Sequence, residues 1–220
     1  MNRRPTLLAA IALTAVAALS LSACGSDDSS KKKDNDKIAG ADTGDEKSAS
    51  PSASASDSAK RPTIKLPSDL TMKFEGEKTG NSVKDAVLAD SAERMRGVNA
   101  AIAGTDPKQE ALGFYNSGKA LEAALTWVGK FKDAKLGITG SIRYYNRTVT
   151  LDGSKVASVV FCADESKGYA KNLKTGKPQV TTPSDEDFIL YNTRLEKNRD
   201  GVWQTTRIVS TAGAKQCLNK

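Results

Sequence analysis

The pattern of hydrophobic and polar positions changes several times along the 220 residues, and each pattern predicts a different kind of structure. Residues 7–21 form a mostly apolar run without charged residues, whereas Gly, Ser, Ala, Asp and Lys dominate residues 25–60. From residue 81 apolar residues recur at helical spacing, and from residue 136 the period changes to two. Helical periodicity followed by a period of two predicts helices first and strands afterwards, which is typical of an α+β domain.

The first predicted helix begins at Asn81 or Ser82, either of which can cap its first turn. Asp85, three residues after Ser82, completes a weak capping box. Gly104 is predicted to end the helix. The charged residues of this segment, Arg94 among them, are expected mostly away from its apolar face. One amphipathic helix is therefore predicted, with apolar positions at Val83, Val87, Met95, Val98 and Ile102.

Two further helices are predicted before the strands. Pro107 begins a short helix that reaches about Tyr115, since proline is tolerated in a first turn. Gly118 separates it from a third helix over residues 119–134, in which Trp127 lies near the edge of the apolar side. That apolar side consists of Leu121, Ala124, Leu125, Val128 and Phe131.

Four strands are predicted after the helices, where β-branched residues become frequent. Their ranges are 137–151, 155–164, 186–197 and 202–211. Asp152-Gly153 predicts a hairpin turn between the first two. The second strand is apolar on both faces, which is typical of a strand in the middle of a sheet. Residues 165–184 are predicted to form a polar loop, and residues 61–80 either an arm lying on the domain or a short edge strand.

The apolar run follows Arg3 and Arg4 and precedes small residues, which is the order of a secretory signal peptide. Its length of about 15 residues is too short for a bilayer span of roughly 20. The segment Leu21-Ser22-Ala23-Cys24 resembles the lipobox of bacterial lipoproteins. The resemblance implies removal of residues 1–23, a diacylglyceryl group on Cys24, and a mature protein held at the extracytoplasmic face of the cell membrane. The alternative is an ordinary secreted protein.

Residues 24–60 are predicted to be a lipidated, disordered tether, because their apolar content is too low to offset the entropy of ordering. Removal of residues 1–23 takes away two arginines and lowers the formal charge from +7 to +5. A basic protein can be drawn to anionic lipid headgroups or acidic wall polymers. Since no compact cluster of Lys and Arg occurs after the tether, the charge is interpreted as solubilising, and no nucleic-acid partner is expected.

The chain contains no histidine, which excludes catalysis by a Ser-His-Asp or Cys-His arrangement and the common His-containing zinc sites. No cofactor or metal is expected. Of the three cysteines, Cys24 is assigned to the lipid. Cys162 and Cys217 are then an even pair in an exported chain, which favours a disulfide; two reduced, buried thiols are the alternative.

Three segments carry a second resemblance: Tyr144-Tyr145, Phe161-Cys162-Ala163-Asp164 and Gly201-Val202-Trp203-Gln204. In a chain of three helices followed by four antiparallel strands, they resemble the NTF2-like (SnoaL-like, cystatin-like α+β) superfamily, most of all its small bacterial lipoproteins. The resemblance covers residues 81–220. It implies three N-terminal helices packed on a curved four-stranded antiparallel sheet that forms a cone. Catalytic members use an Asp–His dyad or an Asp with a Tyr, and the missing histidine excludes the first.

The candidate pocket residues are Trp127, Tyr144, Tyr145, Asp164 and Tyr191. The aromatic side chains can line an apolar pocket, although packing in the core or on the sheet explains them as well. Asp164 is a candidate for a buried carboxylate that acts as a base, against the alternative of a rim charge. Its neighbour is also a carboxylate, but adjacent strand residues point to opposite faces, so only one of the two can enter a pocket.

The leading functional hypothesis is a lipid-anchored, extracytoplasmic binding or interaction protein, whose partner is an envelope protein or a small apolar ligand. The alternatives are an isomerase- or dehydratase-type enzyme with an Asp/Tyr proton-transfer site, and a purely structural envelope protein; no catalytic residue is assigned. An open cone with a carboxylate inside favours the enzyme. A cone filled by Trp127 and Phe131 favours a partner-binding surface.

Overall fold

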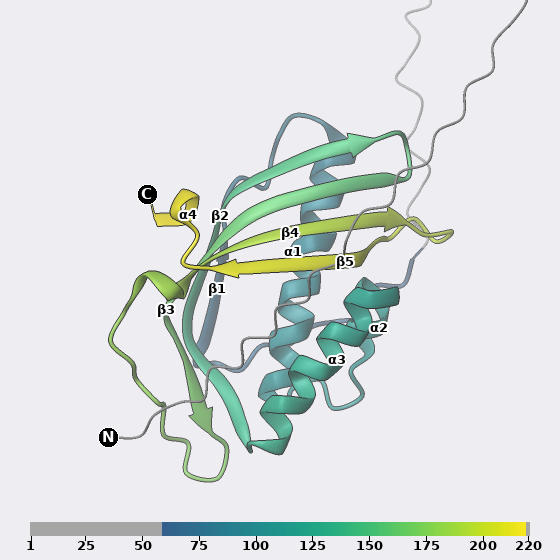
Figure 1. The fold of residues 1–220 in the computed structure, drawn as a ribbon. Coiled ribbons are helices and arrows are strands. Elements are labelled where there is room, and N and C mark those ends of the chain that lie inside the picture. Colours follow the sequence, from purple (N-terminus) through teal and green to yellow (C-terminus); the bar gives the residue numbers. More distant parts are fainter. Residues whose placement is uncertain (1–58, 219–220) are drawn as a thin grey trace, which may run out of the picture. The chain divides into compact units, whose positions relative to one another are not determined.

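The computed structural model describes residues 59–218, which Figure 1 colours by sequence. The predicted signal peptide at residues 1–23, the lipidation site Cys24 and nearly all of the predicted tether lie outside the described residues. After one short strand, three helices precede four long strands, so the α+β class is confirmed. Among the described residues, no helix is long and apolar enough to cross a membrane.

Three helices lie on one side of the sheet: α1 (Ser82–Ala103), α2 (Glu110–Tyr115) and α3 (Gly118–Asp133). The Oδ1 atom of Asn81 caps α1 by accepting two backbone N–H groups of the first turn, at 3.0 and 3.1 Å. Gly104 ends α1 in the left-handed conformation, with φ 78°. The predicted capping box is wrong, because the Asp85 carboxylate instead accepts the backbone N–H and the hydroxyl of Thr79, both at 2.7 Å.

The second helix begins later than its proline predicts. The Asp106 carboxylate accepts the backbone N–H groups of Glu110 and Ala111, each at 3.2 Å. A side-chain cap before the helix therefore sets its start, and Pro107 lies in the preceding turn. In α3 the predicted apolar stripe is wider than the buried face, since Leu125 is 46% exposed.

The sheet is five-stranded and mixed, where four antiparallel strands were predicted. In spatial order its strands are β1 (Leu70–Phe74), β2 (Leu136–Asp152), β3 (Val156–Asn172), β4 (Phe188–Lys197) and β5 (Trp203–Ala212). The last four form the antiparallel meander, and β1 is added parallel to β2 at the edge. The strand alternative for residues 61–80 accounts for the fifth strand, because the alternating apolar residues of β1 pack inward: Phe74 stacks on Tyr144 with ring centroids 4.6 Å apart.

β3 extends well beyond its predicted end at residue 164, into the region predicted as a polar loop. Residues 167–172 of β3 pair with residues 136–141 of β2, so polar composition alone does not mark a loop here. Close backbone approach accompanies this pairing. Gly140 has φ 98° and lies opposite Gly168, and a Cβ atom on Gly140 would lie 2.1 Å from the carbonyl oxygen of Lys167. Only glycine fits at that point.

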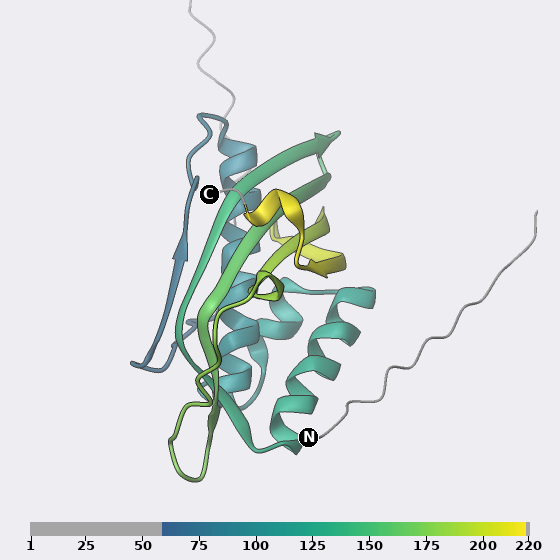
Figure 2. The same ribbon diagram turned by 60° about the vertical axis from the view of Figure 1, so that its left-hand side comes forward.

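The core lies between α1 and the face of the sheet that the helices cover (Figures 1 and 2). It joins apolar side chains from α1 and every strand, among them Leu88, Met95, Tyr144, Phe161, Leu195 and Trp203. A second cluster ties the three helices together through Val98, Ile102, Leu112, Ala124 and Val128. The predicted packing of the first helix against the sheet is thus observed, and two layers enclose the core. The helix is less amphipathic than predicted, because Asp90, Arg94 and Asn99 are buried and Val83 is 37% exposed.

The predicted disulfide between Cys162 and Cys217 is present, with the two Cα atoms 5.5 Å apart. It joins β3 to α4 (Lys215–Leu218), a short helix after the last strand. Cys162 alternates with Phe161, which packs in the core, so the bridge lies on the opposite face of the sheet. There the disulfide, Tyr145 and Ala214 form a separate apolar cluster that covers the middle of the sheet.

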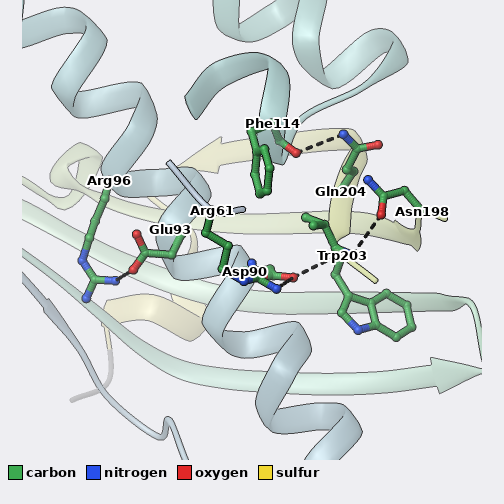
Figure 3. Close-up of polar contacts among 9 residues, drawn as sticks. Arg61, Asp90, Glu93, Arg96, Phe114, Asn198, Trp203 and Gln204 are labelled. Atoms are coloured by element: carbon green, nitrogen blue, oxygen red, sulfur yellow. Dashed lines mark hydrogen bonds and ion pairs between the residues drawn. The ribbon is translucent and has the colours of Figure 1, made fainter. Parts of the chain in front are cut away.

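An arm before β1, residues 59–69, lies against the helices. Ala59 and Ile64 pack on a buried cluster that includes Tyr115 of α2. The Arg61 guanidinium donates to the carboxylate of Asp90 on α1, and the other oxygen of that carboxylate accepts the backbone N–H of Trp203 at 2.8 Å (Figure 3). One buried carboxylate therefore joins the arm, α1 and the start of β5.

Candidate functional site

A cavity of about 420 Å³ lies between α1, α3 and the sheet. Its apolar walls are formed by Met95, Val98, Ile102, Ala124, Trp127, Phe131, Ile138, Ile142, Ile189 and Ile208. Its polar groups are few, and they are Arg94, Asn99, Tyr144, Glu165, Tyr191 and Ser210. A mostly apolar cavity of this size with a few polar groups is the usual form of a small-molecule site.

Three of the predicted pocket residues line this cavity: Trp127, Tyr144 and Tyr191. They come from α3, β2 and β4, which explains why no local motif connects them. The Trp127 ring packs edge-on against Phe131, with centroids 5.2 Å apart, and the indole is half exposed. Trp127 and Phe131 therefore form one wall and do not fill the space.

Two predicted pocket residues, Tyr145 and Asp164, lie elsewhere. Tyr145 packs in the cluster around the disulfide, and its hydroxyl donates to the backbone carbonyl of Cys217. The Asp164 carboxylate accepts hydrogen bonds from the backbone N–H and the hydroxyl of Ser166, and it lies 3.9 Å from the Arg143 guanidinium. Neither side chain lines this cavity, and the reason is the same for both: they share the face of Cys162, away from the helices.

Glu165, the neighbour of Asp164, is the carboxyl group that enters the cavity. It has the same parity along β3 as Phe161, so both point toward α1. The Tyr191 hydroxyl donates to the Glu165 carboxylate at 3.3 Å. Burial raises the pKa of Glu165 to about 7, and the nearby Asp187 carboxylate adds to the rise, while the Tyr191 hydrogen bond opposes it. The group is therefore partly protonated at neutral pH.

Tyr144 brings an unsatisfied donor to the same cavity. Its side chain is fully buried, and its hydroxyl has no hydrogen-bond partner. Burial, followed by the negative charge of Glu165, raises the pKa of Tyr144 well above its usual value. The phenol therefore stays protonated and can donate a hydrogen bond. Its ring is held by Phe74 and Phe161, which fixes the direction of the hydroxyl.

Arg94 is a second group that the helical pattern misplaced, since its side chain is buried and lines the cavity. Its Nε donates to Oδ1 of Asn116 at 2.7 Å, and its Nη1 contacts the sulfur of Met95 at 3.1 Å. Burial lowers the pKa of Arg94 to about 10, so the guanidinium stays charged at neutral pH. Among residues 59–218 no group of three or more acidic or cysteine side chains could hold a metal ion.

The pKa of Glu165 predicts a pH-dependent stability. Its folded value, about 7, lies above the ordinary value of 4.5. The contribution of the protonated group is therefore complete below pH 4.5, declines as the pH rises, and is lost above about pH 7. Wild-type protein should lose roughly 2–3 kcal/mol more unfolding free energy between pH 5 and pH 8 than Glu165→Gln does, as measured by urea denaturation. Equal losses in the two proteins would contradict this prediction.

No protein-family model matches the chain, and no curated protein matches it in sequence. Among solved structures it is similar to a ketosteroid isomerase-like protein from Erwinia carotovora atroseptica (18% identity, TM-score 0.40, 60% of this chain and 97% of that one). It is also similar to the intermembrane space region of the chloroplast protein ARC6 (12%, 0.36, 56% and 96%). A third is a protein from Novosphingobium aromaticivorans named after scytalone dehydratase (11%, 0.31, 59% and 91%). All three TM-scores are low, and the α+β fold is defined by the helices and strands described above.

Proposed function

We propose that this chain is a lipid-anchored, extracytoplasmic protein whose domain binds a small, largely apolar molecule in the cavity between α1, α3 and the sheet. The single observation that carries the binding site is the cavity of about 420 Å³, with mostly apolar walls and a few inward-facing polar groups. Because Trp127 and Phe131 form a wall of an open space, the arrangement favours a ligand inside the cone over a partner on its surface.

A neutral fluorescent probe, N-phenyl-1-naphthylamine, tests the site. Ala123 lines the cavity but is exposed, so Ala123→Phe should narrow the cavity without disturbing the core. Thr126→Phe adds the same side chain at an exposed position of α3 that does not line the cavity. We expect saturable binding of the probe, a loss of about tenfold in affinity in Ala123→Phe, and wild-type affinity in Thr126→Phe. Equal binding by all three proteins would refute the cavity as the site.

A second candidate function is proton transfer; an open cavity with a carboxyl group inside is the arrangement expected of an enzyme, and the pair of Glu165 and Tyr191 provides that group. A carboxyl group with a pKa of about 7 is suited to accept and return a proton at neutral pH. Glu165 takes the role that the sequence hypothesis gave to an aspartate, and the reaction class is an isomerisation or dehydration beside a carbonyl group. The test is hydrogen–deuterium exchange at the α carbon of 2-tetralone, followed by NMR in D₂O. Catalysed exchange that Glu165→Gln abolishes supports the enzyme, and no exchange above buffer rejects it for this ketone.

The lipid anchor is supported by the residues Leu21-Ser22-Ala23-Cys24 and by the apolar run before them. Cys24→Ser removes the thiol that would receive the lipid. Since stable anchoring generally takes more than one acyl chain, the variant should lose labelling by radioactive palmitate and leave the membrane fraction or remain uncleaved. A variant that still incorporates palmitate would show that the lipobox assignment is wrong.

A further inference from the structure

One cation in the cavity wall has no anion opposite it. The Arg94 side chain is buried, and its two described polar contacts are with neutral groups, the amide oxygen of Asn116 and the sulfur of Met95. Arg94 forms no ion pair with any residue in the range 59–218. A buried charge without a counter-charge is costly, so this position favours a group that brings one.

The carboxylates that could neutralise Arg94 are engaged elsewhere. Asp90 lies four residues earlier on α1, at the spacing of a helical ion pair. Its two oxygens instead face the Arg61 guanidinium and the backbone N–H of Trp203 (Figure 3). Glu165, the carboxyl group of the cavity itself, accepts from Tyr191 and makes no ion pair with Arg94. Because Arg61 of the arm occupies the Asp90 carboxylate, the Arg94 guanidinium has no carboxylate partner among the described residues.

A second, independent group in the same cavity also lacks an acceptor. The Tyr144 hydroxyl is buried, lines the cavity and has no hydrogen-bond partner. Asn99 lines the cavity as well; its Nδ2 gives one hydrogen to the carbonyl of Met95, and its side-chain amide also lies beside the Tyr144 hydroxyl, toward which it acts as a donor. The Arg94 guanidinium and the Tyr144 phenol are both donors without an anionic acceptor, so together they suit an oxygen acceptor with negative charge.

We propose that the molecule bound in the cavity carries a carboxylate, which accepts hydrogen bonds from Arg94 and Tyr144 while its apolar body lies against Trp127, Phe131 and the isoleucines of the sheet. The inference rests on the cavity being a ligand site, as proposed above. One guanidinium balances one negative charge, which selects a monoanionic carboxylate over a phosphate monoester of nearly two charges. The ligand class is therefore an apolar carboxylic acid.

The test compares decanoate with decan-1-ol, which has the same chain without the charge, by isothermal titration calorimetry below the micelle concentration. Wild-type protein should bind decanoate about tenfold or more tightly than the alcohol. Arg94→Met should abolish this preference. Tyr144→Phe should reduce it several-fold with little effect on folding, because the buried hydroxyl donates to no acceptor in the protein. Arg194→Met is the control, since Arg194 pairs with Glu196 and does not line the cavity; it should keep the preference.

The possible results distinguish a failure of the carboxylate inference from a failure of the proposed ligand-binding function. If wild-type protein binds acid and alcohol equally, and Ala123→Phe weakens both, the cavity binds ligands but the carboxylate assignment is overturned. If neither compound binds, the carboxylate inference is overturned, and the naphthylamine titration alone decides whether the cavity is a ligand site. If Arg94→Met does not fold, as shown by a lost melting transition, Tyr144→Phe decides: an unchanged preference overturns the inference and a reduced preference supports it.

Discussion

Replacing both Cys162 and Cys217 by alanine is expected to lower the free energy of unfolding by up to about 4 kcal/mol. The bridge spans a sequence separation of 55 residues. Without the bridge, the unfolded chain regains the conformational entropy that closing this loop removes. In the chain-entropy description, that loss of entropy in the unfolded state is the main source of disulfide stabilisation. Alanine avoids placing a hydroxyl in the apolar cluster where both cysteines are buried. The loss is a large share of the roughly 5–15 kcal/mol that holds a typical domain together.

Urea denaturation with and without a thiol reductant measures this effect. Reductant should shift the midpoint of the wild-type protein and leave that of the double alanine variant unchanged, since the variant has no bridge in the domain. A wild-type midpoint that does not respond to complete reduction, verified by mass, would contradict the prediction. Loss of the bridge should also release the short helix α4, which holds Tyr145 through the carbonyl of Cys217.

Asp90→Ala is the second substitution with a large expected effect, about 3 kcal/mol of unfolding free energy. The Asp90 carboxylate is 3% exposed and serves the Arg61 guanidinium and the backbone N–H of Trp203. Alanine leaves the buried N–H without its acceptor and the guanidinium without its carboxylate. Arg61 is one-third exposed, so solvent partly compensates it, and the value lies at the low end for a broken buried pair.

The pair of Glu93 and Arg96 on the same helix provides the matched control (Figure 3). Both side chains are about one-third exposed, and Glu93→Ala should cost at most about 1 kcal/mol, as solvent-screened pairs do. Asp90→Asn keeps an acceptor for the Trp203 N–H but loses the charge. The unfolding free energy that it loses therefore measures the contribution of the Arg61 ion pair, and the remaining loss in Asp90→Ala measures that of the Trp203 hydrogen bond. Equal melting temperatures for Asp90→Ala and Glu93→Ala would show that the buried carboxylate does not hold the arm.

The periodicities of the sequence predicted most of the fold because burial follows them directly. The first helix has the predicted cap and stop, at Asn81 and Gly104. The four long strands follow in the predicted order, and Cys162 and Cys217 are joined. The periodicity does not show which segments far apart in the sequence pair as strands. The far end of β3 is polar, and only its partner, the first part of β2, makes it a strand.

The site was predicted in part, and the errors share a physical origin. Around residue 161 both faces of β3 are apolar, so the strand itself does not tell which face meets the helices. The second apolar face exists because α4 and the disulfide cover it, and this contact depends on a cysteine 55 positions away. The choice between Asp164 and Glu165 was therefore open. Arg94 was missed because a charged residue in a helix is usually exposed, and no local signal marks the cavity it faces.

The arm described above also determines where a mechanical load enters the domain. A pull along the chain from its N-terminal side reaches Ala59 and Arg61 before β1. Arg61 forms an ion pair with Asp90 of α1, and between Arg61 and β1 the arm is also held by Ile64 and by the hydrogen bond from the Thr105 hydroxyl to the carbonyl of Lys65. A load from that side therefore acts first on the longest helix of the domain and on the turn after it, and it reaches the parallel pairing of β1 with β2 only after these contacts yield.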